Sequence, residues 1–527
     1  MKRNLKLLGT LSTAALMTLG ITAMTYAAGW DNSTGQWRFL DKNGSVICNE
    51  WKADNGNWFY LGSDGVMVKN ALIEDNSDSK PRYYFVNKDG AMSRNTWKAV
   101  AIDDNNSEDI EAQYWWYYLG ADGRAYTSGD KFSASSIKTI NGLKYAFDQE
   151  GHMLYGWINA ETPEQQDYDD TAWQTSTYYF NGWNDGHMQT GWKQIHVTDN
   201  DGDDQNYWFY FGTNGKKCGD GRAQLKKING KRYHFAADGH MQDEWLLGSA
   251  SEWAEPKASG STLKDVVYLK QDGAERKNRW AWTVPEEKWL AQDYDNDDYS
   301  WWYFDNSGNP VNNTIRKING RKYAFDKYGR MITGIIKVDA GEVTFIDGND
   351  REDTAHLDEL SRTEYINLAK SLPDTAEIYY FNDDAYRDGS MRTGYQNINL
   401  EDDTYQFYFG RNGKASTGYD AKIRKFTVGG LILKPSRDDD NNYGFIKGVQ
   451  VENGNYVMSG DISISTNISD AANSIMVNKS GEVMKNKTGI RDMNDQYYVT
   501  DKDGVVTDTF ADYDSYKNWQ KNNRNTK

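Results

Sequence analysis

A short unit recurs from Trp30 to near the end of this 527-residue chain, and the repetition limits the fold more than any other feature. Each unit holds two or three aromatic residues and then a polar turn that ends in glycine, as in Trp58-Phe59-Tyr60-Leu61 before Gly65. Such turn glycines number 15: Gly44, Gly65, Gly90, Gly123, Gly151, Gly186, Gly215, Gly239, Gly273, Gly308, Gly329, Gly389, Gly413, Gly481 and Gly504. A chain of this kind folds as an array of similar units, each in contact mainly with its neighbours.

Each unit is predicted to be one β-hairpin. Aromatic and β-branched residues lie on each side of an Asp-Gly or Asn-Gly turn, where glycine tolerates the positive φ angle that such turns need. A lone hairpin is marginally stable in water, so the units must stack and bury a face of each against its neighbours. We therefore predict an all-β fold, an elongated solenoid of stacked β-hairpin repeats.

The two faces of each hairpin follow from the two-residue period of a strand. Counted back from the turn glycine, positions six and four are apolar or aromatic in nearly every unit, as Tyr233 and Phe235 are, and are predicted to be core. Positions seven and five face the other way and are aromatic in many units, as Trp208 and Tyr210 are. With a further tryptophan upstream, here called the lead tryptophan, these rings predict aromatic-walled slots between successive hairpins, which are candidate ligand sites.

A longer period is also visible, because Ile140-Asn141-Gly142, Ile228-Asn229-Gly230 and Ile318-Asn319-Gly320 lie 88 and 90 residues apart. The short hairpin that follows each of them lacks the outward aromatic pair. We predict that every third hairpin is a spacer, which supplies at most its tyrosine to a neighbour's slot.

Composition restricts the classes of function. Aromatic residues make up 14 % of the chain but all hydrophobic residues only 38 %, so aliphatic residues for several conventional enzyme cores are scarce. The formal charge of -17 argues against a nucleic-acid partner. Because carboxylates are so abundant, two that lie near each other carry no information about catalysis. We predict no enzyme, no catalytic residue and no cofactor.

Metal binding finds little support. The two cysteines, Cys48 and Cys218, form neither a disulfide framework nor a paired-cysteine metal signature. His152, His187 and His240 each follow a turn glycine, which makes them a repeat position. The loop that begins at Asp199 is partly like a calcium loop, but Asp204 and Tyr210 stand where glycine and glutamate are required. A solvated acidic loop is favoured, and calcium binding stays open as the alternative.

The chain divides into five predicted segments. Residues 1–28 have the positive start, apolar stretch and small-residue end of a secretory signal peptide. Hairpin repeats with long acidic loops occupy 29–338, an inserted segment occupies 339–377, further repeats occupy 378–420, and degenerate repeats or a C-terminal cap occupy 421–527. In the inserted segment the spacing of Leu357, Leu360 and Tyr365 predicts a helix, with Thr354 as its N-cap.

The units resemble a known family. Gly29-Trp30 with Gly35-Gln36-Trp37, and Trp51 to Met67, are similar to the cell-wall-binding, or choline-binding, repeats of Gram-positive bacteria, and Gly151-His152-Met153 shows the same ending. The resemblance extends, with decay, over residues 29 to 510. It implies stacked hairpins in which two aromatic residues of one repeat and one of the next surround a choline ammonium, often closed by a methionine. Aromatic faces suit a quaternary ammonium, which has no hydrogen-bond donor.

Carried over residue by residue, the resemblance implies five ligand-binding sets: Trp30, Trp37 and Tyr60; Trp51, Trp58 and Phe85; Trp97, Trp116 and Tyr118; Trp192, Trp208 and Tyr233; Trp280, Trp301 and Tyr323. It implies a secreted, non-catalytic protein on the wall of a Gram-positive bacterium, with teichoic acid choline or polysaccharide as partner. The leader's own residues predict no membrane span after signal cleavage, and a row of open hairpin ends permits a homodimer. Related repeats stack on sugars in glucan-binding proteins, so an adhesin for glucan or host glycan is the alternative. A third hypothesis is a purely structural surface protein.

Overall fold

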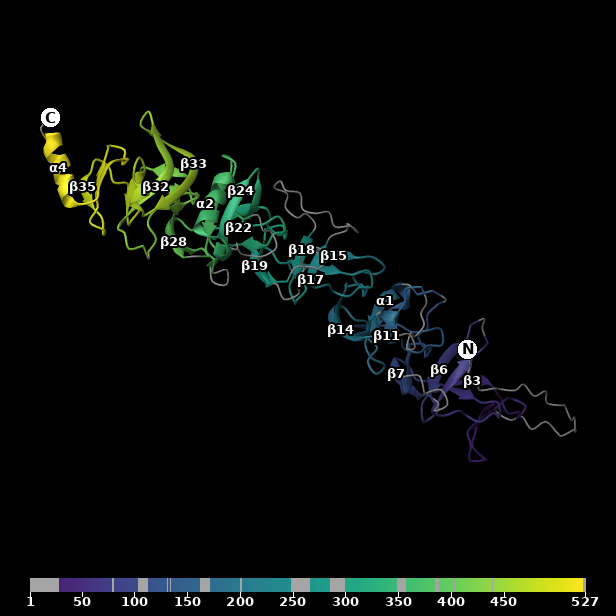
Figure 1. Ribbon diagram of the computed structural model, residues 1–527. Helices are drawn as coiled ribbons and strands as arrows, with labels where there is room; N and C mark the ends of the chain where they lie inside the picture. The colour runs from purple at the N-terminus through teal and green to yellow at the C-terminus, as the bar shows by residue number, and fades with distance from the viewer. Residues whose placement is uncertain are drawn as a thin grey trace. The chain divides into compact units, whose positions relative to one another are not determined.

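The computed structural model describes residues 28–77, 80–102, 112–129, 131–132, 134–161, 171–199, 201–247, 266–284, 299–347, 357–383, 388–401, 403–437 and 439–524. The predicted signal peptide, apart from its last residue, lies outside these ranges, as does Thr354. The chain forms two compact units, residues 1–242 and 243–527 (Figure 1). No helix in the described ranges is long and apolar enough to span a membrane.

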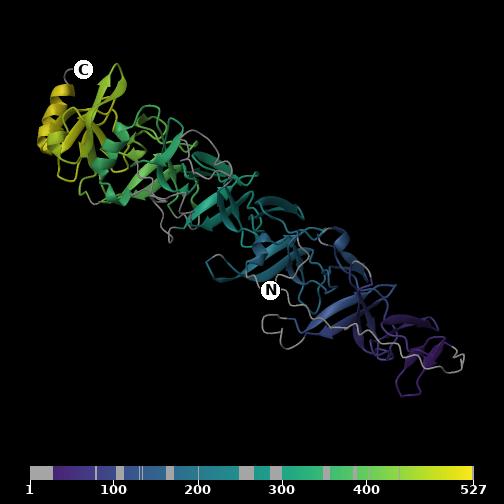
Figure 2. The ribbon, with the colours of Figure 1, turned by 90° about the vertical axis from the view of Figure 1, so that its right-hand side faces the viewer.

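The first unit consists of antiparallel hairpins, each formed by two strands that are consecutive in the chain. In Figure 2 these hairpins follow one another in chain order through the purple and blue part of the ribbon. The strands are β1 (Gly29–Asp31), β2 (Arg38–Leu40), β3 (Glu50–Asp54), β4 (Asn57–Leu61), β5 (Ala71–Asp75), β6 (Arg82–Val86), β7 (Thr96–Ala101), β8 (Tyr114–Leu119), β9 (Lys138–Ile140), β10 (Leu143–Tyr145), β11 (Gly156–Ile158), β12 (Tyr178–Phe180), β13 (Gly191–Thr198), β14 (Asp204–Phe211), β15 (Gln224–Ile228) and β16 (Lys231–Phe235). Two short helices, η2 (Ala134–Ser136) and α1 (Ala172–Thr175), lie between strands.

The predicted hairpins are present, but the turn glycine is not at the hairpin's own tip. In β3–β4 the tip is Asn55-Gly56, and Gly65 follows the second strand, where only an isolated bridge joins Leu61 to Met67. Gly65 has φ +72°, and a Cβ there would lie 2.1 Å from a Val46 side-chain carbon. The glycine is therefore required by both its φ angle and the close approach of the neighbouring unit.

Both faces of each hairpin are used in stacking. Because the lead tryptophan pairs directly with the residue five before the turn glycine, as Trp192 does with Tyr210, these side chains share a face. That face packs on the residues six and four before the glycine in the next hairpin. The apolar side chains form several small clusters rather than one core, for example Ile140, Tyr145, Phe147 and Met153 with Trp97 and Trp116 packed against them.

The second unit begins with the same hairpins and then changes. Its strands are β17 (Glu244–Leu247), β18 (Val266–Leu269), β19 (Arg279–Thr283), β20 (Ser300–Phe304), β21 (Thr314–Ile318), β22 (Arg321–Phe325), β23 (Met331–Ile332), β24 (Gly334–Asp339), β25 (Glu342–Phe345), β26 (Glu377–Phe381), β27 (Gly394–Asn399), β28 (Thr404–Phe409), β29 (Gly418–Asp420), β30 (Lys425–Val428), β31 (Leu431–Ile432), β32 (Tyr443–Glu452), β33 (Asn455–Ser465), β34 (Ile475–Asn478), β35 (Thr488–Arg491), β36 (Tyr497–Thr500) and β37 (Val506–Phe510). From β21 onward the strands join into sheets of three or five, the largest in the order β27-β28-β31-β30-β29.

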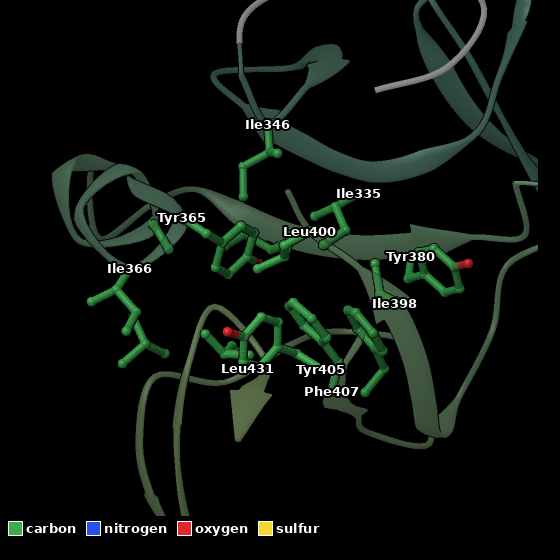
Figure 3. Close-up of a cluster of buried hydrophobic side chains, with 14 of the residues drawn as sticks. Ile335, Ile346, Tyr365, Ile366, Tyr380, Ile398, Leu400, Tyr405, Phe407 and Leu431 are labelled. Atoms are coloured by element: carbon green, nitrogen blue, oxygen red, sulfur yellow. The ribbon is translucent and has the colours of Figure 1, made fainter. Parts of the chain in front are cut away.

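A large hydrophobic cluster runs through this later part, from Ala324 to Val483, and a smaller one contains Phe445 and Tyr498. Figure 3 shows its centre, where Tyr365 of helix α2 (Arg362–Ser371) lies beside Phe407 of β28. Their ring centroids are 5.2 Å apart, and the Tyr365 hydroxyl donates to the Gly429 carbonyl at 2.7 Å. Aliphatic side chains such as Ile335 and Leu431 surround these rings.

The helix predicted within 339–377 is present as α2, but its cap differs from the prediction. Ser361 is the N-cap and forms a capping box with Glu364, while Leu357 belongs to a separate short helix, η3 (Leu357–Glu359). The described ranges also contain α1, η4 (Ile468–Asp470) and α4 (Tyr513–Arg524), for which the sequence pattern made no prediction. Helix α4 packs Tyr516 and Trp519 on Phe510 of the last sheet.

Candidate ligand-binding site

Three rings meet wherever a hairpin with two outward tryptophans faces the next hairpin. The lead tryptophan forms the back wall, the tryptophan seven before the turn glycine forms a side wall, and a ring six before the glycine of the next hairpin forms the third wall. We call this arrangement a tryptophan box. Five sets of described residues hold these three positions: Trp30, Trp37 and Phe59; Trp51, Trp58 and Tyr84; Trp97, Trp116 and Tyr145; Trp192, Trp208 and Tyr233; Trp280, Trp301 and Tyr323. The lead tryptophan contacts the third wall in all five, and the two tryptophans contact each other in the first, fourth and fifth.

In the first, fourth and fifth boxes the two tryptophans are nearly perpendicular. In the fourth box the centroids of Trp192 and Trp208 are 6.4 Å apart with an interplanar angle of 83°, and Tyr233 lies 4.8 Å from Trp192. The first and fifth boxes repeat this geometry, with interplanar angles of 83° and 89° between their tryptophans. Perpendicular walls leave a corner between two ring faces, which is a receptor shape for a compact cation.

A methionine lies beside four of the side walls. The backbone N–H of Met241, two residues after the next turn glycine, donates to the carbonyl of Trp208 at 2.7 Å. Met67, Met92 and Met153 make the same bond to their side-wall tryptophans in the first three boxes. In the fifth box Met331 belongs to the cluster on which Trp280, Trp301 and Tyr323 pack. The thioether adds a polarizable surface without a charge.

Three of the side walls are open to solvent, whereas Trp116 and Trp301 are half-buried. Trp37, Trp58 and Trp208 are 42 %, 41 % and 41 % exposed, whereas the lead tryptophans are half-buried. Trp30, Trp51 and Trp116 each bury an indole N–H for which no partner is found among the described residues. Packing of the ring faces, rather than hydrogen bonding, therefore sets the position of these rings.

One tyrosine wall, Tyr145 of the third box, has a raised pKa. Burial raises the pKa of Tyr145, and the Asp185 carboxylate adds to the shift. Near the second box, burial and Asp75 raise the pKa of Tyr60 in the same way. Carboxylates near neutral rings create a negative potential, which favours a cationic ligand over an anionic one.

The structure brings some predicted sets together and separates others. The members of the fourth and fifth sets meet as described above. In the first set, Tyr60 packs on Trp51 of its own hairpin, with ring centroids 5.2 Å apart. The ring of the next hairpin that contacts Trp30 is Phe59. Phe85 lies opposite Leu72, and Trp51 meets Tyr84 instead.

In the third set Tyr118 is the strand partner of Trp97, at 5.2 Å, and the ring from the next hairpin is Tyr145 at 4.9 Å. Sequence reasoning thus missed Phe59, Tyr84 and Tyr145. A consistent count would have found them, because Tyr233 and Tyr323 stand six residues before their turn glycines and so do the three missed rings. The tyrosines of the short spacer hairpins, Tyr145, Tyr233 and Tyr323, each contact the preceding lead tryptophan.

No group of three or more His, Cys, Asp or Glu side chains in the described part of the chain could hold a metal ion. His152, His187 and His240 each place Nδ1 within 2.8 Å of an aspartate of their own turn. The Asp199 carboxylate accepts the N–H groups of Asp201 and Asp203, and these bonds hold its pKa low, with the Asp203 N–H as the larger cause.

Two family models match parts of the chain. The family model described as "Choline-binding repeat" matches residues 48–97, which contain the whole second box, and "Putative cell wall binding repeat" matches residues 224–241, which contain Tyr233 and Met241. The chain carries choline-binding repeats. Repeats of these kinds are binding modules of cell-surface and wall-binding proteins.

Two relatives extend the similarity. Glucosyltransferase-S of Streptococcus mutans is 28 % identical over 323 residues, which are 61 % of this chain and 17 % of that protein. Glucosyltransferase-I of Streptococcus downei is 25 % identical over 424 residues, 75 % of this chain and 21 % of that protein. The chain therefore spans a small part of the length of these relatives.

Several solved structures are also similar. CbpJ of Streptococcus pneumoniae is 18 % identical, with 61 % of this chain and 99 % of that chain covered and a TM-score of 0.33. The autolysin LytC of the same organism is 21 % identical, with 59 % and 54 % covered and a TM-score of 0.31. The choline-binding domain of CbpL, also from S. pneumoniae, is 21 % identical, with 48 % and 98 % covered and a TM-score of 0.28.

Proposed function

We propose that this is a secreted, non-catalytic protein that attaches to the wall of a Gram-positive bacterium by binding choline groups of teichoic acid in its tryptophan boxes. The observation that carries the proposal is the exposed side wall: Trp37, Trp58 and Trp208 keep about two fifths of their surface in water beside a half-buried lead tryptophan. Rings that only held the hairpins together would gain more by full burial.

The chemistry supports a quaternary ammonium. Such a cation cannot donate a hydrogen bond, so ring faces bind it without leaving a donor unpaired, at about 0.5 to 2 kcal/mol per contact. One box binds weakly, but several boxes on one chain raise the effective concentration for the next site on a polymeric wall. Retention on the wall would then be multivalent and reversible by free choline.

A choline titration of the chain tests this proposal. We expect a saturable quench of tryptophan fluorescence and a higher melting temperature at millimolar choline, with five sites per chain by equilibrium dialysis. Trp208→Leu should remove one of the five. Trp183→Leu, which changes a tryptophan that contacts Tyr114 outside the boxes, should keep all five. Absence of any response to choline in the unmodified chain would refute the proposal.

The second candidate is a glucan-binding or host-glycan-binding adhesin on the same repeats, and the two glucosyltransferase relatives favour it. A sugar ring can stack on an exposed tryptophan as a cation can. Soluble dextran in the same titration distinguishes the two: a quench by dextran but not by choline would select the adhesin.

A further inference from the structure

One lead tryptophan faces a cation of the chain itself. Lys217 Nζ lies 5.4 Å from the ring centroid of Trp157, the lead tryptophan of hairpin β11–β12. Lys217 comes from the next hairpin, β13–β14, and is only 3 % exposed. Trp157 otherwise has the usual neighbours of a lead tryptophan, with Tyr179 at 4.9 Å and Phe209 at 5.1 Å.

Lys217 occupies the place of the box methionine. It stands two residues after its turn glycine, where Met67, Met92, Met153, Met188 and Met241 stand in other hairpins. Its backbone N–H donates to the Thr177 carbonyl at 2.8 Å, the bond that the methionines make to a side wall. A Cβ on Gly239 would lie 2.5 Å from Cδ of Lys217, just as one on Gly215 would lie 2.2 Å from Sδ of Met188. The lysine stem thus packs as the methionine does and adds a charge at its end.

The ammonium is surrounded by carbonyl oxygens. Nζ donates to the carbonyls of Trp173 at 2.5 Å, Asp238 at 2.6 Å and Gln174 at 3.4 Å. Trp173 and Gln174 belong to helix α1, in the loop of hairpin β11–β12, whereas Asp238 belongs to the turn after β16. One ammonium therefore joins three successive hairpins of the first unit.

The side wall of this slot also differs. Thr177 stands where the boxes have tryptophan, and its hydroxyl donates to the Asp220 carboxylate at 3.1 Å. Burial lowers the pKa of Lys217 to about 8, while the Asp220 and Asp238 carboxylates act against that shift. The slot thus offers hydrogen-bond acceptors and one ring face, whereas a box offers ring faces.

We propose that the Trp157 slot is a primary-ammonium site that the chain fills with Lys217, so that it takes no external quaternary ammonium. The three carbonyls need N–H donors, which a lysine ammonium has and a choline headgroup lacks. Lys217 therefore decides the chemistry of this slot: a residue two after the turn glycine closes a box when it is methionine and occupies the slot when it is lysine.

The later part of the second unit contains a similar arrangement. Lys485 Nζ lies 4.6 Å from the ring centroid of Tyr419 and 5.1 Å from that of Tyr456. Both rings come from strands whose sheets lack lead tryptophans. Occupation of an aromatic cage by the chain's own lysine thus occurs in each unit.

Chemical rescue tests the proposal on the full chain at pH 7. Lys217→Ala removes the side chain beyond Cβ, and n-propylammonium replaces the missing atoms one for one. We expect Lys217→Ala to melt about 5 °C or more below the unmodified chain and to recover most of that loss in n-propylammonium. Tetramethylammonium of equal concentration should shift the variant no further than it shifts the unmodified chain.

Lys217→Met is the matched control, because methionine is the usual residue at this position. Its melting temperature should not respond to n-propylammonium beyond the response of the unmodified chain. If Lys217→Ala does not fold in buffer, refolding in n-propylammonium but not in tetramethylammonium is the expected result. Equal rescue by both cations, rescue of Lys217→Met, or no rescue of Lys217→Ala would overturn the proposal. Rescue is read without choline, so a failed choline titration leaves this test intact.

Discussion

The tryptophan hairpins and the sheets after Gly334 pack repeats of similar length in different ways. In the tryptophan hairpins, each pair of hairpins buries its own small cluster around a lead tryptophan, and a second tryptophan stays at the edge of that cluster. In the sheets after Gly334, one large cluster runs through many strands, with isoleucine, leucine and valine around tyrosine and phenylalanine. Ile335 is the second residue of β24, as Trp280 is the second residue of β19.

The difference separates stacking from binding. Strands with an aliphatic residue at the lead position still stack. Ile335, which holds that position in β24, and Phe407 both have no exposed surface. Outward tryptophan is therefore not required to hold such repeats together. The proposed ligand binding accounts for its recurrence in the earlier hairpins, where three side walls are exposed.

Deleting a ring from the large cluster should have the largest effect on stability and none on the boxes. Phe407→Ala removes a fully buried side chain that contacts Tyr365 and Phe409. We expect a loss of about 3 to 5 kcal/mol in the free energy of unfolding of the second unit, measured by urea denaturation. Tyr395→Ala, in the same sheet but 47 % exposed, is the control and should lose less than about 1.5 kcal/mol.

Choline binding by the Trp192 box should be unchanged in both variants. If Phe407→Ala stayed folded but lost choline binding there, the separation of stacking from binding would fail.

Raising the pH should stabilise the first unit through Lys217. Its folded-state pKa is about 8 and its ordinary value is 10.5, so between these values the unfolded chain holds more protons. The free energy of unfolding then rises with pH in this window, by about 3 kcal/mol in total, and this contribution is lost as pH falls through 8. Tyrosines titrate in the same range, so the difference between the unmodified chain and Lys217→Met is the quantity to measure. A difference that does not change with pH would show that the ammonium is not buried in the folded state.

The two tryptophans of one box should differ in what their loss removes. Trp192→Ala deletes a back wall that contacts Tyr210 and Tyr233, and we expect about 2 to 3 kcal/mol less stability together with the loss of that site. Trp208→Ala deletes a side wall that is 41 % exposed and should remove the site at less than about 1.5 kcal/mol. Thermal unfolding and equilibrium dialysis with choline measure the two quantities. Equal stability losses would mean that the side wall is structural.

Much of this arrangement could be predicted from the sequence, because hairpin strands are local. The lead tryptophan and the rings seven and five before the glycine lie within one hairpin, so the period of a strand places them on one face. The third wall comes from the next hairpin, and its identity depends on the offset between hairpins. That offset is set by long-range bonds such as Met241 N–H to the Trp208 carbonyl, which no local pattern contains.

The Lys217 slot could be predicted only in part. The replacement of methionine by lysine is visible in the sequence, but two of the three carbonyls belong to α1, inside an acidic insertion that has no repeat pattern. The cap of α2 was missed for a different reason. Thr354 was the predicted cap, and the local signal for Ser361, a glutamate three residues later, was not used.

That cap gives the smallest expected effect. The Ser361 hydroxyl accepts the Glu364 N–H at 3.3 Å, and Glu364 Oε2 accepts the Ser361 N–H at 2.9 Å. Ser361→Ala removes one half of this capping box, which should lower the free energy of unfolding of the second unit by about 1 kcal/mol. Thr363→Ala, at an exposed position in the same turn, is the control and should change it by less than about 0.5 kcal/mol. Tyr365 is the first buried residue of α2, so a larger loss of unfolding free energy in Ser361→Ala would mean that the first turn holds the helix on the cluster. No loss would mean that Ser361 is not the N-cap and that a residue upstream caps the helix.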